Sequence, residues 1–264
     1  MKNKISITLS EKTLTKVDMI VDNIFIRNRS QAIEHLINTA LGENRIAVIL
    51  AGGDEEENRI SEKEYRITAK TKQGKVVERA IKKLREDGFK TVFVVARHKI
   101  LTSVFEILSD GSEYGVKVNY VEEKVSTGTA ASLRLLKGKI NDHFIVVYGD
   151  IVFDKINIDD LWTDHLKTGP LSTLMLTTSS KPSEKGTIKM EGSKILEFVQ
   201  KPKGSDVYLV FSPIFVTDPD ILDYDGASLE KDVFPVIAQK GLLRGHLSSE
   251  KEIHIHSKAD LRQV

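Results

Sequence analysis

Apolar residues change their spacing several times along the amino-terminal part of the chain. Over residues 4–9 polar and apolar side chains alternate, which predicts a short strand with one apolar face. From Ser10 to Asn23, and again from Ser30 to Gly42, apolar positions recur at helical spacing. A serine favours the N-cap of each helix, and a glycine favours the position just after the second one. The pattern therefore predicts a strand followed by two helices.

From Ile46 onward, short apolar runs alternate with segments of helical periodicity. This alternation predicts an α/β domain with a Rossmann-like, mostly parallel sheet and helices on both faces. Ligands of such sheets bind at the carboxyl ends of the strands. We therefore expect a small domain of residues 1–44 and a larger one of residues 45–264. The expected strands of the larger domain are residues 46–50, 91–96, 116–121 and 144–148, and its expected helices are residues 75–86, residues 100–108 and one that begins near Thr129.

Composition and charge narrow the function classes. The formal net charge is +1 at pH 7, so any contact with DNA would need a local group of cations rather than an overall positive field. The chain has no cysteine, which excludes disulfides, a thiolate nucleophile and cysteine-ligated zinc. No apolar run has the length of a membrane span, and the first residues lack the apolar core of a signal peptide. We expect a cytoplasmic protein without membrane contact.

The small domain is too short to bury the apolar faces of both helices, and a lone strand has two unpaired edges, so we expect it to pair with a second copy. Its order of elements, with Arg29-Ser30 at the start of the second helix, resembles the ribbon-helix-helix family of DNA-binding proteins. The resemblance implies a homodimer, or a higher homo-oligomer, that binds double-stranded DNA. Dimerisation without DNA binding is the alternative. By position, the resemblance assigns DNA contacts to Lys2, Lys4, Ser6, Thr8, Arg29 and Ser30.

Several short segments of the larger domain occur in a set order. They are Leu50-Ala51-Gly52-Gly53, Ser126 to Ala131, Tyr148-Gly149-Asp150, the stretch from Gly186 to Pro202, and Leu229 to Pro235. In this order they resemble the nucleotide-diphospho-sugar pyrophosphorylase family of nucleotidyltransferases. The resemblance implies a nucleotide or nucleotide-sugar ligand, a sugar-phosphate contact and Mg²⁺ at Asp150. The implied nucleotide-binding residues are Leu50, Ala51, Gly52, Gly53, Gly128, Thr129, Ala130 and Asp150, and the implied sugar-phosphate contacts are Gln200 and Lys201.

Other positions depart from the pattern of that family. The carboxylates of residues 54–57 follow the glycine turn, where the family has a cationic loop that holds phosphates. The catalytic lysine of the family falls near Arg66, so only Arg66, or Lys70 with a gap, could substitute for it. A guanidinium could hold a phosphate, but its planar shape is not interchangeable with the point charge of an ammonium. Gln200 stands where the family has glutamate, and His254 stands where its second metal-binding aspartate belongs. Imidazole is a poor ligand for Mg²⁺. If the chain is active, the expected catalytic residues are Arg66 and Lys201.

His254 and His256 alternate with isoleucines, so both imidazoles lie on one face of a strand. Together with Asp150 they could bind Zn²⁺ or Mn²⁺. The other interpretation is a half-exposed edge strand without a metal.

The retained glycines and Asp150, beside the missing cations, favour a DNA-binding transcription regulator. In this hypothesis the protein is a homodimer whose nucleotidyltransferase-like domain binds a nucleotide or nucleotide-sugar as an effector, with weak or no catalysis. The alternative is an active Mg²⁺-dependent sugar-1-phosphate nucleotidyltransferase, in which Arg59 or Arg66 supplies the missing cation. A third possibility is a structural dimer with an inert scaffold.

Overall fold

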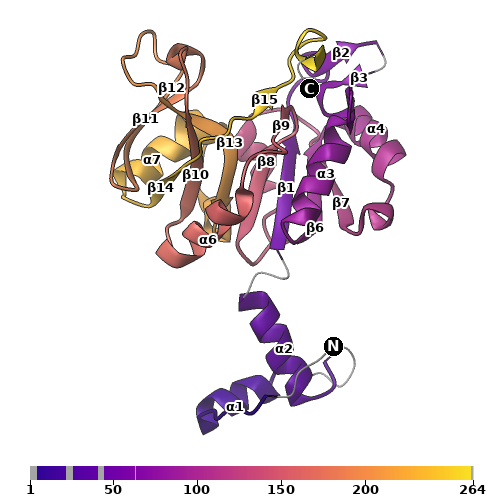
Figure 1. Ribbon diagram of the computed structural model, residues 1–264, viewed down its shortest axis with the longest axis vertical. Helices are drawn as coiled ribbons and strands as arrows, with labels where there is room; N and C mark the ends of the chain where they lie inside the picture. Colours follow the sequence, from indigo (N-terminus) through magenta and orange to yellow (C-terminus); the bar gives the residue numbers. More distant parts are fainter. Residues whose placement is uncertain (1–4, 22–25, 41–44, 63, 263) are drawn as a thin grey trace. The chain divides into compact units, whose positions relative to one another are not determined.

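A computed structural model of the chain describes residues 5–21, 26–40, 45–62, 64–262 and 264. The chain divides into two compact units, Met1–Asn44 and Arg45–Val264. Figure 1 shows both units. Within the described residues, no helix is both long enough and apolar enough to cross a membrane.

The first unit contains the helices α1, Glu11–Asp18, and α2, Arg29–Ala40. The Ser10 hydroxyl accepts a hydrogen bond from the Thr13 amide at 3.2 Å and caps α1. Ser30 does not cap α2, because the side chain of Asn28 accepts the Gln31 amide at 3.0 Å and starts the helix earlier. Helix α1 ends before Asn23, which lies outside the described residues.

The strand predicted for residues 4–9 is wrong for the part that is described. Residues 5–9 have no regular secondary structure, and Ile5 and Ile7 are 71% and 50% exposed. A single chain offers this segment no neighbouring strand to complete its backbone hydrogen bonds. Ser6 and Thr8 are exposed on the same segment, while Lys2 and Lys4 lie outside the described residues.

The second unit is built on a nine-stranded sheet with the order β10-β14-β12-β11-β13-β8-β1-β6-β7. Strands β8, β1, β6 and β7 are parallel, as predicted. The prediction of a mostly parallel sheet is wrong for the other half, where most pairings are antiparallel. There β11 and β12 form a hairpin with a short turn, which only antiparallel strands allow. The strands are β1 Arg45–Ala51, β6 Phe89–Ala96, β7 Lys117–Glu122, β8 Phe144–Tyr148, β10 Ser172–Thr178, β11 Gly186–Glu191, β12 Lys194–Gln200, β13 Leu209–Thr217 and β14 Leu243–Leu247.

Helices cover both faces of the sheet, with α3 and α4 beside its parallel half and α7 beside β12 and β14 (Figure 1). Successive residues of β1 pack on opposite faces: Ala47 and Ile49 join the core under α3, α4 and α6, while Val48 and Leu50 join the core under α5 and α7. The sheet is therefore buried on both sides along β1. The helices are α3 Val76–Glu86, α4 His98–Leu108, α5 Thr129–Arg134, α6 Ile158–Thr168 and α7 Phe234–Gln239, the last preceded by a π-helical turn, Leu229–Val233.

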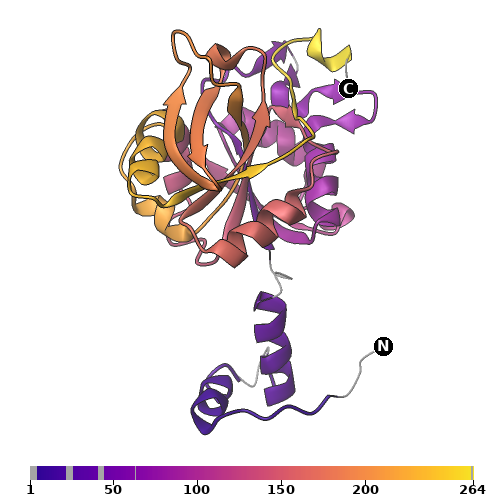
Figure 2. The ribbon, with the colours of Figure 1, turned by 60° about the vertical axis from the view of Figure 1, so that its left-hand side comes forward.

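Three pairs of short strands lie outside the main sheet: β2 Arg59–Ser61 with β3 Glu64–Tyr65, β4 Lys70–Thr71 with β5 Gly74–Lys75, and β9 Ile151–Val152 with β15 Ile253–His254. The last pair brings the carboxyl-terminal segment, yellow in Figures 1 and 2, to the end of β8. A small apolar cluster secures it there, formed by Ala69, Val76, Val152, Ile255 and Val264.

Candidate functional site

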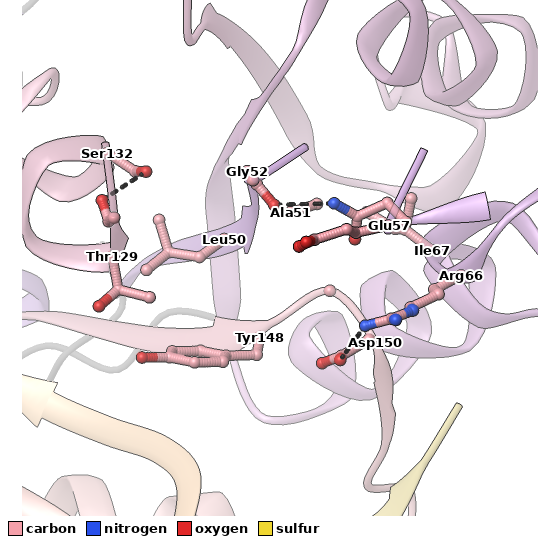
Figure 3. A pocket seen from close by; sticks show the side chains of 14 residues that line it. Leu50, Ala51, Gly52, Glu57, Arg66, Ile67, Thr129, Ser132, Tyr148 and Asp150 are labelled. Atoms are coloured by element: carbon pink, nitrogen blue, oxygen red, sulfur yellow. Dashed lines mark hydrogen bonds and ion pairs between the residues drawn. The ribbon is translucent and has the colours of Figure 1, made fainter. Parts of the chain in front are cut away.

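A pocket lies at the carboxyl ends of β1 and β8, beside the start of α5 (Figure 3). It contains about 740 Å³ of space, counting its open mouth. Of the residues predicted to bind a nucleotide, all except Ala130 line it. The lining residues are Leu50, Ala51, Gly52, Gly53, Glu57, Asn58, Arg66, Ile67, Gly128, Thr129, Ser132, Tyr148, Gly149 and Asp150.

The glycine turn after β1 is held by a buried carboxylate. Glu123 is 2% exposed and accepts hydrogen bonds from the Ser132 hydroxyl and, at 2.9 Å, from the Gly53 amide. A Cβ on Gly52 would lie 2.5 Å from Glu123 Oε2, so glycine is needed here to make room for this carboxylate. Glu123 was not predicted as a site residue. It directly follows β7, just as Asp150 comes shortly after the end of β8. The rule that ligand sites lie at strand ends could have found it.

The wall formed by the start of α5 carries hydroxyl groups. Thr129 Oγ1 donates to the Glu230 carboxylate at 2.8 Å, and the Tyr148 hydroxyl donates to the other oxygen of Glu230. Burial, and then the charge of Glu230, raises the pKa of Tyr148 well above its ordinary value of 10, so the phenol keeps its proton. The prediction for Ala130 is wrong: its side chain packs in the core, and its amide donates to the Ala227 carbonyl at 2.9 Å.

Charged side chains gather at the opposite end of the pocket, where Figure 3 shows Arg66 beside Asp150 and Glu57 nearby. Arg66 Nη1 lies 3.6 Å from Asp150 Oδ2, and Arg66 Nε is buried without a hydrogen-bond partner among the described residues. Of the described residues that line the pocket, Arg66 is the one with a positive charge. It therefore supplies a cation where the sequence analysis expected a deficit.

The carboxylates that follow Gly53 do not all face the pocket. Glu55 pairs with Lys99 at 3.3 Å, and Glu56 pairs with Arg59 at 2.9 Å. Among residues 54–57, Glu57 is the member that lines the pocket. The structure therefore brings one carboxylate of this segment to the pocket, and ion pairs outside the pocket hold two of the others. Arg59 is engaged in one of these pairs and does not line the pocket.

Asp150, His254 and His256 lie together at the pocket's charged end. One potential ligand atom from each lies within 4.8 Å of the other two. The imidazoles are stacked, with centroids 5.4 Å apart and planes 20° apart, as expected for side chains on one face of a strand. Burial lowers the pKa of His256, and the charge of Asp150 opposes this effect. The two histidines therefore lie on a short strand, β15, and are also grouped with Asp150.

A buried ionic cluster that the sequence analysis missed lies behind His254. Glu252 has a fully buried side chain and accepts from His254 Nε2 at 2.9 Å, Lys185 Nζ at 2.7 Å and the Ser212 hydroxyl at 2.7 Å. Burial alone would raise the pKa of Glu252, but these hydrogen bonds and the charge of Lys185 outweigh it and lower the pKa to about 2. No sequence spacing indicates the cluster, because Lys185 and Ser212 come from distant segments.

Gln200 and Lys201 lie at the end of β12 and are not among the residues that line the pocket. The Lys201 amide donates to the Lys185 carbonyl at 3.0 Å, and the residue has a left-handed backbone with φ of 47°. Gln200 Oε1 is buried without a hydrogen-bond partner among the described residues. Their contact with a sugar phosphate stays a prediction.

In the first unit, the Arg29 guanidinium forms an ion pair with Asp18 at 2.6 Å, and Ser30 lies in the first turn of α2. The DNA contacts predicted for Lys2, Lys4, Ser6 and Thr8 have no support from the residues that the structure describes.

Comparisons with known proteins match the larger unit. Residues 46–234 match the nucleotidyl transferase family. The mannose-1-phosphate guanylyltransferase catalytic subunit beta of Dictyostelium discoideum is 34% identical over 47% of this chain and 36% of its own length. The protein of the same name from Danio rerio is 29% identical over 52% of this chain and 40% of its own length. The chain thus spans about two fifths of the length of these relatives.

A solved structure with the same fold comes from Bacillus anthracis and is described as a glucose-1-phosphate thymidylyltransferase in complex with sucrose. Its TM-score is 0.74 at 19% identity, and the match covers 82% of this chain and 92% of that chain. At this identity the similarity shows the α/β fold alone.

The prediction of a DNA-binding regulator with weak or no catalysis is wrong, because the relatives are named mannose-1-phosphate guanylyltransferases. Counting along the sequence overestimated the loss of cations, since the fold brings the Arg66 guanidinium to Asp150. The comparisons lend no support to a ribbon-helix-helix domain, and the family match begins at residue 46. Because that match extends to residue 234 and so covers well over half of the chain, the chain belongs to the nucleotidyl transferase family.

Proposed function

We propose that the chain is a sugar-1-phosphate nucleotidyltransferase, which joins a nucleoside triphosphate to a sugar 1-phosphate and releases pyrophosphate. One observation carries the proposal: a single pocket is lined by the glycine turn after β1, the start of α5, Arg66 and Asp150. Membership of the nucleotidyl transferase family supports it further. The names of the relatives make GTP and mannose 1-phosphate the first substrates to test.

In the proposed reaction an oxygen of the sugar 1-phosphate attacks the α-phosphorus of the triphosphate. A new phosphorus–oxygen bond forms while the bond from the α-phosphorus to the bridging oxygen breaks, and pyrophosphate leaves with that electron pair. Negative charge is spread over the phosphoryl oxygens in the transition state, so a fixed cation lowers the barrier. We assign this role to Arg66, the positively charged side chain among the described residues that line the pocket.

The opposite wall of the pocket would hold the nucleoside. Thr129, Ser132 and Tyr148 present hydroxyl groups there (Figure 3). Thr129 and Tyr148 are fixed by Glu230, and Ser132 is fixed by Glu123. Hydroxyls held by buried carboxylates bind with little loss of conformational entropy, which favours a preorganised pocket. Leu50 supplies an apolar surface beside them.

The family resemblance implies Mg²⁺ at Asp150, and the side chains around Asp150 test this. Mg²⁺ demands oxygen ligands in octahedral geometry. Among the described residues, the potential metal ligands grouped with the Asp150 carboxylate are the imidazoles of His254 and His256. This donor set does not fit Mg²⁺, so no step of the proposed reaction is assigned to that ion.

The test is pyrophosphate release by the full-length chain, with each common nucleoside triphosphate paired with each of a panel of sugar 1-phosphates. Mg²⁺, Mn²⁺ and Co²⁺ are supplied in separate series. We expect turnover with at least one pair, and loss of at least about 100-fold in kcat/KM in Asp150→Asn. Absence of pyrophosphate above the blank with every pair and every ion would overturn the proposal.

We also propose that the first unit joins two copies of the chain. Ile5, Ile7 and Leu9 alternate with polar residues on an exposed segment, and Leu36 and Ile37 of α2 are 40% and 42% exposed. Pairing of two such units would remove this apolar surface from water.

A further inference from the structure

The carboxyl-terminal segment is positioned with its two histidines beside Asp150 by backbone contacts. Strand β15 pairs antiparallel with β9, which begins directly after Asp150. The Ile255 amide donates to the Asp150 carbonyl at 2.8 Å. Ile255 is fully buried in the small apolar cluster with Val152 and Val264, so its neighbours His254 and His256 are directed away from that cluster.

The Asp150 carboxylate is open to a further ligand. Within the described residues it accepts no hydrogen bond, and its neighbours are Arg66 Nη1 at 3.6 Å and His256 Nδ1 at 3.7 Å. Both distances exceed a normal hydrogen bond. A carboxylate 21% exposed in a pocket therefore retains lone pairs that can bind a cation.

Glu252 sets the proton on His254. An ionised carboxylate can only accept a hydrogen bond, so the 2.9 Å contact between His254 Nε2 and Glu252 Oε1 places the proton on Nε2. Lys185 Nζ lies 3.3 Å from the same nitrogen, but it donates to Glu252 Oε1 at the shorter distance of 2.7 Å. In the neutral ring the lone pair is then on Nδ1. A carboxylate that holds one nitrogen of an imidazole while the other binds a metal is a common arrangement around bound metals.

The geometry points to a binding site for a divalent transition ion, of the Zn²⁺ or Co²⁺ type, formed by Asp150, His254 and His256 in place of a magnesium site. Two imidazole nitrogens and one carboxylate oxygen suit such ions, which form bonds of about 2.0–2.2 Å to these atoms. In a tetrahedral site, ligand atoms with these bond lengths lie about 3.3–3.6 Å apart. The ligand atoms here lie within 4.8 Å of one another, so binding of an ion requires the side chains to approach one another by about 1 Å.

This inference rests on the proposed function only for the role of the ion in the reaction, and the test measures metal binding itself. The full-length chain is freed of metal with a chelator and titrated with Co²⁺, while visible absorption follows the bands of nitrogen-ligated Co²⁺. Zn²⁺ affinity is measured by competition with Co²⁺, and Mg²⁺ is added as a competitor in excess. We expect one Co²⁺ per chain, displaced by Zn²⁺ and not by Mg²⁺ at about 100-fold excess over Co²⁺.

Variants locate the site. His254→Ala and His256→Ala should each weaken Co²⁺ binding at least about 10-fold, and Glu252→Gln should weaken it about 10- to 100-fold through His254. His98→Ala removes a histidine whose side chain is 75% exposed on α4 and should change nothing. His256→Asp should shift preference toward Mg²⁺, because it exchanges a nitrogen ligand for oxygen. Melting temperatures of the metal-free variants show whether each is folded.

The outcomes separate the two proposals. Bound Co²⁺ with histidine-dependent bands, but no pyrophosphate release, would sustain the metal site and refute the transferase. Turnover with Mg²⁺ in a chain that binds no Co²⁺, or Co²⁺ binding unchanged in both His254→Ala and His256→Ala, would overturn the metal site and leave the transferase standing.

Discussion

His165 of α6 is a histidine whose burial decides its charge. It is fully buried, and its ring nitrogens lie 3.0 Å from Thr173 Oγ1 and 3.3 Å from His143 Nδ1. Burial, and then the charge of His143, lowers the pKa of His165 from 6.5 to about 4. The folded protein therefore keeps this ring neutral in a pH range where the unfolded chain binds a proton.

Because the unfolded state binds more protons between pH 6.5 and pH 4, stability falls as the pH drops through this window. Between pH 7 and pH 4, the free energy of unfolding of the wild type should fall by about 3 kcal/mol more than that of His165→Gln. Denaturant unfolding at each pH measures the difference. Thr173→Val removes a hydrogen-bond partner but keeps the imidazole, so its free energy of unfolding should change with pH as steeply as that of the wild type. An equal pH dependence in wild type and His165→Gln would refute this account.

Among the individual site residues, some were predictable from the sequence and others were not. Asp150 was predictable, because a carboxylate that follows an apolar strand is costly unless it faces a cleft. Glu230 and Glu252 were not identified, because their function depends on partners far away in the chain. The Tyr148–Glu230 contact, for example, spans 82 residues. Arg66 was a candidate from spacing, but its place in the pocket depends on the turn before it.

At the scale of elements, the turn between β8 and β9 approaches β1 closely. The Gly149 amide donates to the Leu50 carbonyl at 2.7 Å. A Cβ on Gly149 would lie 2.7 Å from Ala51 Cβ and 3.1 Å from Ile67 Cδ1. Glycine here lets Asp150 and the glycine turn line the same pocket.

Gly149→Ala should therefore destabilise the fold by about 1–3 kcal/mol, because the added methyl group overpacks the contact with β1. Thermal unfolding measures the effect. Gly204→Ala is the matched control, since an added Cβ there meets nothing within 4 Å. The same melting temperature in both variants would show that the approach of the two strands is not tight.

Long elements of the larger unit were predictable from hydrophobic periodicity. The strand predicted over residues 144–148 has the bounds of β8, and the helices over residues 75–86 and 100–108 match α3 and α4 within two residues. The two- and three-residue strands β2, β3, β4, β5 and β9 were not predicted, because so few residues carry no period. The antiparallel half of the sheet was also missed, since strand pairing depends on the whole chain.

At the scale of the whole molecule, we expect the first unit to make the protein a dimer. Ile5→Asp/Ile7→Asp places charges on the apolar face of the exposed segment and should give a monomer by light scattering at tens of micromolar. Ser6→Asp/Thr8→Asp adds the same charge to the alternate positions and should leave the dimer intact. A monomeric wild type, or dimers in both variants, would contradict the proposed role of this unit.

The central claim is that nucleotidyl transfer takes place in the pocket and that Arg66 stabilises the negative charge of the transition state. The most direct measurement is kcat/KM for pyrophosphate release by the wild type, Arg66→Ala and Arg59→Ala, with the best substrate pair. Arg66→Ala should lose about 100- to 1000-fold, as for removal of a group that stabilises transition-state charge. Arg59→Ala should lose little, because Arg59 pairs with Glu56 outside the pocket lining. Equal activity in Arg66→Ala and the wild type would contradict the account.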